Sequence, residues 1–74
     1  MLKEQPAWIV YEGDRILDKK FTYAGGYQAF KNAMREAKAS KADTTRLRLV
    51  KGILINNGGT RWDLNHQTAK QILP

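Results

Sequence analysis

Cysteine is absent from this chain of 74 residues, and histidine and serine each occur once. Without thiols, the sequence excludes disulfide bridges, cysteine-ligated zinc and a cysteine nucleophile. His66 could bind a metal only together with scattered carboxylates, and Ser40 stands in a polar segment without the partner motif of a catalytic triad. We therefore predict a non-enzymatic protein with no catalytic residues, no metal site and no cofactor.

Long apolar runs are also missing. The longest run after the N-terminal segment is Ile53-Leu54-Ile55, far below the roughly 20 residues that cross a bilayer. The N-terminal segment contains Glu4 and Pro6, whereas a signal peptide needs an apolar region of roughly 7–15 residues. We therefore expect a cytoplasmic protein that does not interact with a membrane.

Acidic residues are scarce relative to basic ones, at seven against thirteen, which gives a net charge of +6. The excess is not uniform along the chain. Residues 1–23 carry four basic and four acidic side chains, whereas residues 24–51 carry seven basic and two acidic ones, a net charge of +5. Residues 52–74 add +1 from two basic side chains and one acidic side chain. A local excess of this size favours an anionic partner.

The length and composition predict one small basic domain spanning residues 1–74, with residues 1–6 frayed. A domain of this size buries only about 60–65% of the surface of its chain. The hydrophobic residues, 42% of the total, are therefore needed for one modest core. A deep catalytic pocket would compete with that core.

A β-hairpin is predicted near the N-terminus. Residues 7–11 are rich in β-branched and aromatic side chains, and Gly13 and Asp14 then favour a tight turn. In the returning strand Phe21 and Tyr23 share one parity, which predicts that both lie on the buried face.

The strongest local pattern is helical and covers residues 27–39. Its apolar residues are spaced by three and four positions, which predicts the buried stripe of an amphipathic helix. The stripe consists of Tyr27, Phe30, Met34 and Ala37. Gly25 and Gly26 precede this segment and are expected to form a flexible corner, with Gly26 as a weak helix cap.

Residues 45–51 alternate with a period of two, which predicts a strand with one apolar and one basic face. The two faces carry Leu47 with Leu49 and Arg46 with Arg48. Gly52 is expected to interrupt this strand before residues 53–55 resume it.

A second hairpin and a short helix are predicted for the C-terminal part. Residues 56–59 have the sequence Asn-Asn-Gly-Gly, which favours a type I′ turn, and residues 60–64 are expected to return as a strand. Asn65 is the predicted cap of a final helical turn, with Leu64 and Ala69 as its hydrophobic staple.

Together these elements predict an α+β fold. We expect a small antiparallel sheet of about four to five strands packed on one central amphipathic helix, with a short helical turn at the C-terminus. The predicted core consists of Trp8, Val10, Phe21, Tyr23, Tyr27, Phe30, Met34, Leu47, Leu49, Ile53, Ile55 and Trp62. The other face of the sheet is expected to be open to a partner.

The candidate binding residues are mostly basic. On a helical wheel, Lys31, Arg35 and Lys38 fall within about 60° of one another and form a ridge beside the apolar stripe. The candidate residues for binding nucleic acid or another partner are Lys31, Arg35, Lys38, Lys41, Arg46, Arg48 and Arg61, with Tyr11 and Trp62 as candidate stacking residues. Lysines suit phosphate contacts, and arginines suit directed, bidentate contacts.

Two functions from different classes fit this pattern. The first is a small non-enzymatic module that binds DNA or RNA through its basic helix and strand, with an affinity that falls steeply with salt. The second is a small regulator that docks on an acidic surface of a larger host machine, such as RNA polymerase or a nuclease complex, and changes its activity. In style, though by no motif, the chain resembles accessory proteins of phages and mobile elements. We expect a monomer or a weak homodimer.

Each feature also has a purely structural interpretation. Lysines on the solvated face of a helix are common in any small domain, and Trp8 and Trp62 are favoured as core anchors. The concentration of positive charge in residues 24–51 favours a binding function over this interpretation.

Overall fold

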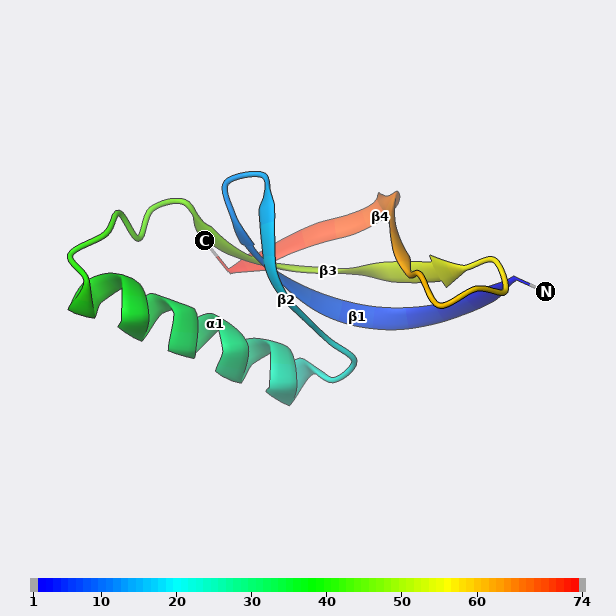
Figure 1. Cartoon of the computed structure of the whole chain (residues 1–74), viewed down its shortest axis with the longest axis horizontal. Helices are drawn as coiled ribbons and strands as arrows, with labels where there is room; N and C mark the ends of the chain where they lie inside the picture. The colour runs from blue at the N-terminus through cyan, green and yellow to red at the C-terminus, as the bar shows by residue number, and fades with distance from the viewer. Residues whose placement is uncertain (1, 74) are drawn as a thin grey trace.

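The computed structural model describes residues 2–73 as a four-stranded antiparallel sheet with a single helix on one face (Figure 1). The elements follow the order β1 (Lys3–Glu12), β2 (Arg15–Lys20), α1 (Tyr23–Ala39), β3 (Leu47–Asn56) and β4 (Asp63–Leu73). The strands are arranged β2-β1-β3-β4, so β1 and β3 form the centre of the sheet. The predicted α+β class, with one helix packed on an antiparallel sheet, is confirmed. No helix within residues 2–73 is long and apolar enough to cross a membrane.

β1 is longer than predicted and pairs with strands on both sides. Residues 8–12 pair with β2, whereas the whole strand from Lys3 pairs with β3. Residues 3–6, which were expected to be frayed, therefore belong to the sheet, and residue 1 lies outside the described residues. Because β2 reaches only as far as Trp8, one side of β1 is open at Pro6. An open strand edge tolerates a residue without an N–H group.

α1 starts at Tyr23, earlier than the sequence predicted. Thr22 caps the helix, because its Oγ1 accepts the backbone N–H of Gly25 at 3.0 Å. Gly25 and Gly26 therefore lie inside the helix, and the predicted corner at these residues is wrong. Gly26 is needed for close packing, since a Cβ atom at this position would overlap the Cβ atom of Trp8 on β1.

The predicted end of the helix at Ala39 is confirmed. Lys41 follows with a left-handed φ of 59°. Two hydrogen bonds close the turn: the N–H of Lys41 donates to the carbonyl of Lys38 at 3.1 Å, and that of Ala42 to the carbonyl of Ala37 at 2.8 Å. This arrangement is a Schellman motif, in which glycine is the usual left-handed residue.

The sheet carries a core on each face, because successive side chains of a strand point to opposite faces. The core beneath α1 contains Val10, Phe30, Ala37, Leu47 and Leu49. The core on the other face contains Ala7, Ile9, Tyr11, Val50 and Leu54, with Trp62, Leu64 and Ala69 packed against it. The face that was expected to be open therefore has an apolar core of its own.

The predicted core is confirmed in part. Four of its members are buried, namely Val10, Phe30, Leu47 and Leu49. Phe21, Tyr23 and Tyr27 are not core residues, because 48%, 50% and 39% of their surfaces are exposed. The other predicted members are half-buried, namely Trp8, Met34, Ile53, Ile55 and Trp62.

β3 runs without interruption through Gly52, contrary to the prediction. A Cβ atom at Gly52 would lie 2.7 Å from Cδ1 of Leu64 and 3.5 Å from Cα of Ala69. Glycine here therefore lets β4 pack closely over the strand. The predicted alternation within β3 is present, because Leu47 and Leu49 are buried in the core beneath α1.

The loop between β3 and β4 is longer than the predicted turn, and β4 begins at Asp63. Asn56, only 5% exposed, holds the loop. Its side chain accepts the N–H of Gly58 at 2.7 Å and donates to the carbonyl of Gly59 at 2.9 Å. Gly58 has a φ of 101°, a conformation that explains glycine at this position.

The predicted C-terminal helical turn is wrong, because this segment forms β4. Asn65 does accept the N–H of Gln67 at 3.0 Å, as a helix cap would. Thr68 then closes the turn: its hydroxyl donates to the carbonyl of Asn65 at 2.8 Å and accepts the N–H of Ile53 at 3.1 Å. The result is a bulge in β4, where the register with β3 shifts between Lys51 and Ile53. Asparagine forms the same local bond in helix caps and in turns.

Candidate nucleic-acid interface

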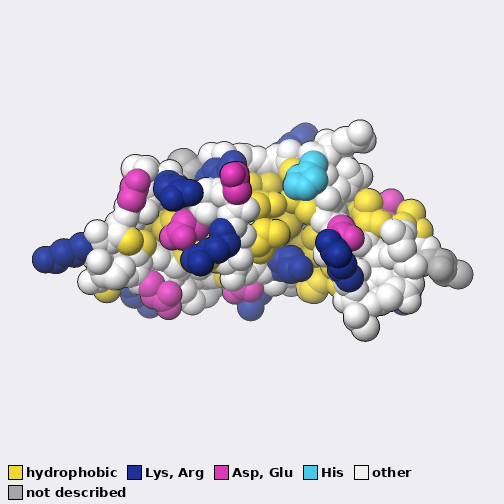
Figure 2. Space-filling model, turned by 45° about the horizontal axis from the view of Figure 1, so that its top comes forward, with side chains coloured by type: hydrophobic (Ala, Val, Ile, Leu, Met, Phe, Trp, Pro, Cys, Tyr) yellow, Lys and Arg dark blue, Asp and Glu magenta, His cyan; other side chains and the backbone are white. Residues whose placement is uncertain are grey.

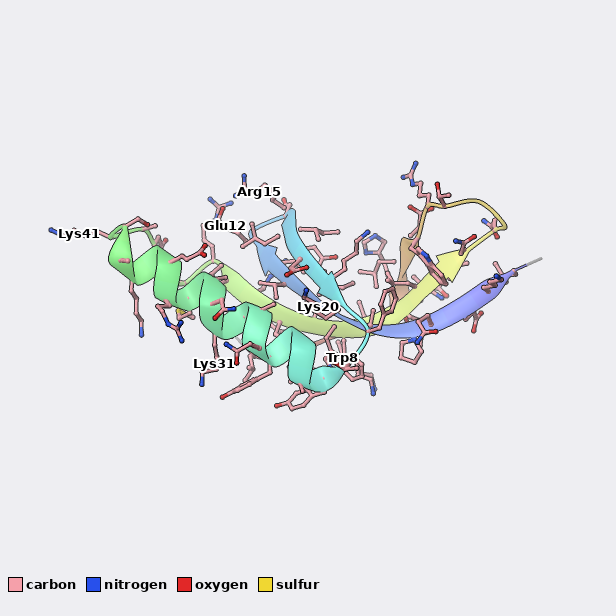
Figure 3. The ribbon with its side chains drawn as sticks, turned by 60° about the horizontal axis from the view of Figure 1, so that its bottom comes forward. Trp8, Glu12, Arg15, Lys20, Lys31 and Lys41 are labelled. Carbon is pink, nitrogen blue, oxygen red and sulfur yellow. The ribbon has the colours of Figure 1, made fainter. Side chains whose placement is uncertain are left out.

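One side of α1 carries a row of exposed basic residues, Lys31, Arg35 and Lys38, which we call the basic ridge. Together with Phe30 and Met34 they line a shallow hollow of about 310 Å³. Figure 3 shows Lys31 pointing away from the sheet into solvent. None of these three cations forms a salt bridge with another residue in the range 2–73. The ridge predicted from the helical wheel is therefore a continuous exposed surface.

Three aromatic rings, Trp8, Tyr23 and Tyr27, form an aromatic row near the start of α1. Tyr27 stacks on Tyr23 with ring centroids 5.9 Å apart, and Tyr23 meets Trp8 edge to face with centroids 6.3 Å apart. A lysine lies over each end of the row. The Nζ atom of Lys31 is 5.5 Å from the ring centre of Tyr27, and that of Lys51 is 5.4 Å from the ring of Trp8. Both distances are within the cation–π range.

A pair of lysines lies on the sheet beside the aromatic row. Lys51 on β3 and Lys70 on β4 are direct partners in the antiparallel register, and both are exposed. Partners in such a register share a face, with Cβ atoms about 4.5–5.5 Å apart. The two positive charges are therefore neighbours, an arrangement that destabilises the sheet unless an anion is present.

The opposite side of α1, which faces β2, has a different character. Here the helix contributes Asn32 and Glu36, and β2 contributes Asp18, to a hollow of about 360 Å³. Two of the three basic residues of β2 are paired with carboxylates. Arg15 lies 3.2 Å from Glu12, and Lys20 lies 3.6 Å from Asp18. The unpaired positive charge of the helix is thus confined to the side with the basic ridge.

Arg48 has a structural role on the sheet face opposite α1. Its Nη2 atom donates to the carbonyl of Gly13 at 2.8 Å, and its guanidinium lies 5.2 Å from the ring centre of Tyr11. Tyr11 is only 9% exposed. Burial raises the pKa of the Tyr11 hydroxyl, and the positive charge of Arg48 opposes this shift. The pair holds the β1–β2 turn against β3 and lies away from the basic ridge.

The other predicted site residues are dispersed. Arg46 precedes β3, and its carbonyl accepts the N–H of Gly13 at 2.9 Å. Arg61 forms an exposed ion pair with Asp63, with Nε and Oδ1 2.8 Å apart. Lys41 lies beyond the C-terminal end of α1 (Figure 3). The structure therefore brings Lys31, Arg35 and Lys38 together and places Lys41, Arg46, Arg48 and Arg61 outside this surface.

An apolar groove of about 200 Å³ lies on the sheet face opposite α1, between β2 and β4. Its lining includes Ile16, Leu54 and Trp62, with His66 at the rim. Figure 2 shows this apolar strip between charged side chains, with the histidine beside it. Trp62 also meets Phe21 edge to face, with centroids 6.0 Å apart. Trp62, a predicted stacking residue, thus belongs to the groove and not to the aromatic row.

Sequence reasoning missed part of this surface. Tyr23, Tyr27 and Lys31 are spaced by four residues, which places them on one helix side once the helix begins at Tyr23. The sequence pattern predicts a strand at Tyr23, and this prediction hides the helical spacing. Lys51 and Lys70 are neighbours only through the register of β4, and the sequence predicted a helix there.

Within residues 2–73, no group of three or more histidine, aspartate and glutamate side chains could hold a metal ion. Comparisons of the chain with protein-family models, curated proteins and solved structures find no significant match. Its function must therefore be inferred from the surfaces themselves.

Proposed function

We propose that this protein is a small non-enzymatic module that binds nucleic acid through the basic side of α1 and the adjoining end of the sheet. The observation that carries the proposal is that cations without salt bridges share one surface with exposed aromatic rings. This basic–aromatic surface consists of Trp8, Tyr23, Tyr27, Lys31, Arg35, Lys38, Lys51 and Lys70. Positive charge that tracks a phosphate backbone, combined with rings that stack on bases, is typical of nucleic-acid-binding proteins.

Phosphate contacts would supply most of the affinity. Five cations belong to the basic–aromatic surface, and each phosphate that a cation neutralises releases bound counterions. For five such contacts, the slope of log affinity against log salt concentration is about −3.5 to −4.5. Affinity should therefore fall roughly 100- to 500-fold between about 50 and about 200 mM salt.

The test is a charge reversal on the ridge with a matched control on β2. The variant Lys31→Glu/Arg35→Glu changes the net charge as much as the control Arg15→Glu/Lys19→Glu, and all four side chains are exposed. Binding to mixed-sequence DNA and RNA is measured by fluorescence anisotropy at about 50 mM salt. Circular dichroism verifies that both variants are folded.

We expect the ridge variant to lose binding roughly 100-fold or more, because two attractive contacts become repulsive. The control variant should bind nucleic acid with nearly the affinity of the parent protein. An equal loss in both variants would contradict this surface, and no binding of the parent protein to any nucleic acid would contradict the function.

A second candidate function is a regulator that docks on a larger protein, and the apolar groove between β2 and β4 favours it. Contiguous exposed apolar surface is typical of protein-binding sites. Ile16 lines this groove and is 44% exposed. Binding to a purified host machine such as RNA polymerase would then survive high salt, be lost with Ile16→Lys, and be unaffected by Lys31→Glu/Arg35→Glu. Either role fits the cytoplasmic location expected from the sequence.

A further inference from the structure

We infer that the nucleic acid bound by the basic–aromatic surface is single-stranded, with unpaired bases against Tyr23 and Tyr27 and phosphates held by the flanking lysines. This inference rests on the proposed function and narrows it. The exposure of the rings and their spacing point to an unpaired strand, and the placement of the lysines fits the phosphates of that strand.

The first observation is that large aromatic side chains are left at the surface. A domain this small has few large apolar residues with which to fill a core. Tyr23 and Tyr27 nevertheless keep 50% and 39% of their surfaces exposed, while Phe30 and Leu49 fill the core beneath α1. A base that displaces Lys31 from the ring of Tyr27 could stack there, because every base has a π-face.

The second observation is the spacing of the rings. Successive base pairs of B-DNA are about 3.4 Å apart, whereas the centroids along the aromatic row are 5.9 and 6.3 Å apart. Tyr23 and Tyr27 stack on each other, so no base fits between them, and bases that contact the exposed sides of successive rings would lie farther apart than in a duplex. A single strand can splay its bases in this way, whereas a duplex would have to break its pairs.

The third observation is that lysines flank the rings on both sides. Lys31 covers the end of the row at Tyr27, and Lys51 covers the end at Trp8. Lys70 is the register partner of Lys51, so two positive charges meet at that end. Their repulsion would be relieved by a bound phosphate.

From the aromatic row the bound nucleic-acid strand would continue along α1 over the basic ridge. Phe30 and Met34 line the hollow between the cations of that ridge, and neither side chain has a hydrogen-bond donor. Phe30 is buried in the core, so the three cations of the ridge are the groups that would contact the nucleic acid, through its phosphates.

The first experiment compares a single-stranded oligonucleotide that lacks self-complementarity with a duplex of the same sequence, in DNA and RNA forms. Anisotropy at about 50 mM salt should show at least about tenfold tighter binding of single strands than of duplexes. Equal or tighter binding of duplexes would overturn the inference and leave the proposed function standing. No binding of any probe would overturn both.

The second experiment tests the rings. Tyr23→Leu/Tyr27→Leu keeps the apolar bulk and removes both aromatic faces, whereas Tyr23→Phe/Tyr27→Phe keeps the faces. A stacked base contributes roughly 5- to 160-fold to affinity. The leucine variant should therefore bind single strands at least about tenfold more weakly, with affinity restored in the phenylalanine variant. Unchanged affinity of the leucine variant would overturn the inference.

The third experiment uses the two tryptophans, which lie on opposite faces of the sheet. Trp62→Phe leaves Trp8, in the aromatic row, as the only indole, and Trp8→Phe leaves Trp62, in the groove. A single-stranded oligonucleotide should quench the fluorescence of the first variant and leave that of the second unchanged. Quenching of Trp62, or of neither tryptophan, would overturn the inference.

Discussion

The two faces of the sheet use positive charge in different ways. On the face opposite α1, Arg48 is fixed between Gly13 and Tyr11. On the α1 side, Lys31 and Lys51 lie over aromatic rings. Every salt bridge found within residues 2–73 belongs to the β1–β2 hairpin or to the start of β4. The cations of the basic–aromatic surface therefore remain free for an external anion.

This difference shows why the net charge of +6 does not by itself identify the residues of a binding surface. Residues 24–51 carry the largest excess, yet the fold divides their basic side chains between the two faces. Arg35 becomes part of the basic ridge, whereas Arg48 stabilises a turn. The position of a cation relative to rings and carboxylates distinguishes the two roles.

The largest predicted effect concerns the two cores. Leu49 beneath α1 is 0% exposed, and Leu54 on the opposite face is 1% exposed. Replacing either leucine with alanine should cost about 2–5 kcal/mol of unfolding free energy, a large part of the roughly 5–10 kcal/mol expected for a small domain. Urea denaturation measures the cost. A loss below about 1 kcal/mol for Leu54→Ala would show that the face opposite α1 has no true core.

The next largest effect concerns the contact between α1 and β1. Gly26→Ala should cost about 1–3 kcal/mol because the new Cβ atom would overlap Trp8, although alanine favours a helix by about 1 kcal/mol. Gly59→Ala is the control, since nothing lies within 4 Å of a Cβ atom there. Thermal denaturation compares the two variants. A more stable Gly26→Ala protein would contradict the close approach of helix and strand.

A pair of arginine substitutions separates binding from stability. Arg48→Ala should cost about 1–2 kcal/mol, because it removes a partly buried hydrogen bond and a cation–π contact, and should leave nucleic-acid affinity unchanged. Arg35→Ala should weaken binding and change stability by less than about 0.5 kcal/mol. Denaturation and anisotropy on both variants measure the two effects. Weaker binding by Arg48→Ala together with unchanged binding by Arg35→Ala would show that nucleic acid binds on the face opposite α1.

The smallest predicted effect lies at the end of α1. Lys41 has a left-handed φ of 59°, which costs a residue with a Cβ atom about 1–2 kcal/mol. Lys41→Gly should therefore stabilise the protein by about 0.5–1 kcal/mol, after the greater freedom of glycine in the unfolded chain is counted. Affinity for nucleic acid should stay nearly constant because Lys41 lies beyond the ridge. A loss of stability in thermal denaturation would contradict the Schellman geometry.

The elements that could be predicted from the sequence are those with strong local periodicity. The helix over residues 27–39 and the buried face of Leu47 and Leu49 both follow from repeats within a few residues. The basic ridge was predictable for the same reason, because a helical wheel needs no information from elsewhere in the chain.

The errors arise where a local signal has two structural uses. A glycine such as Gly26 can end a helix or permit close packing inside one. Here it permits close packing, and this role depends on Trp8, which is distant in the sequence. Asn65 caps a helix or closes a bulge, and the choice depends on Thr68 binding the N–H of Ile53 on the neighbouring strand. Neither partner is near in sequence, so local patterns favoured the wrong element.

The aromatic row was hidden by a similar ambiguity. Large aromatic residues in a small domain are favoured as core residues, so the sequence predicts Tyr23 and Tyr27 in the core. Small and aliphatic residues such as Ala7 and Ile9 fill the second core instead. The adjacency of Lys51 and Lys70 depends on strand register alone, which the sequence does not reveal for a segment that resembles a helix start.

The most direct test of the distinction between the two faces is an NMR titration of amide chemical shifts with a single-stranded oligonucleotide. Binding at the basic–aromatic surface predicts the largest changes at Tyr23, Tyr27, Lys31, Lys51 and Lys70. Residues of the groove, such as Ile16 and His66, should change little. The largest changes in the groove, or no changes anywhere, would contradict the assignment of nucleic-acid binding to the α1 side.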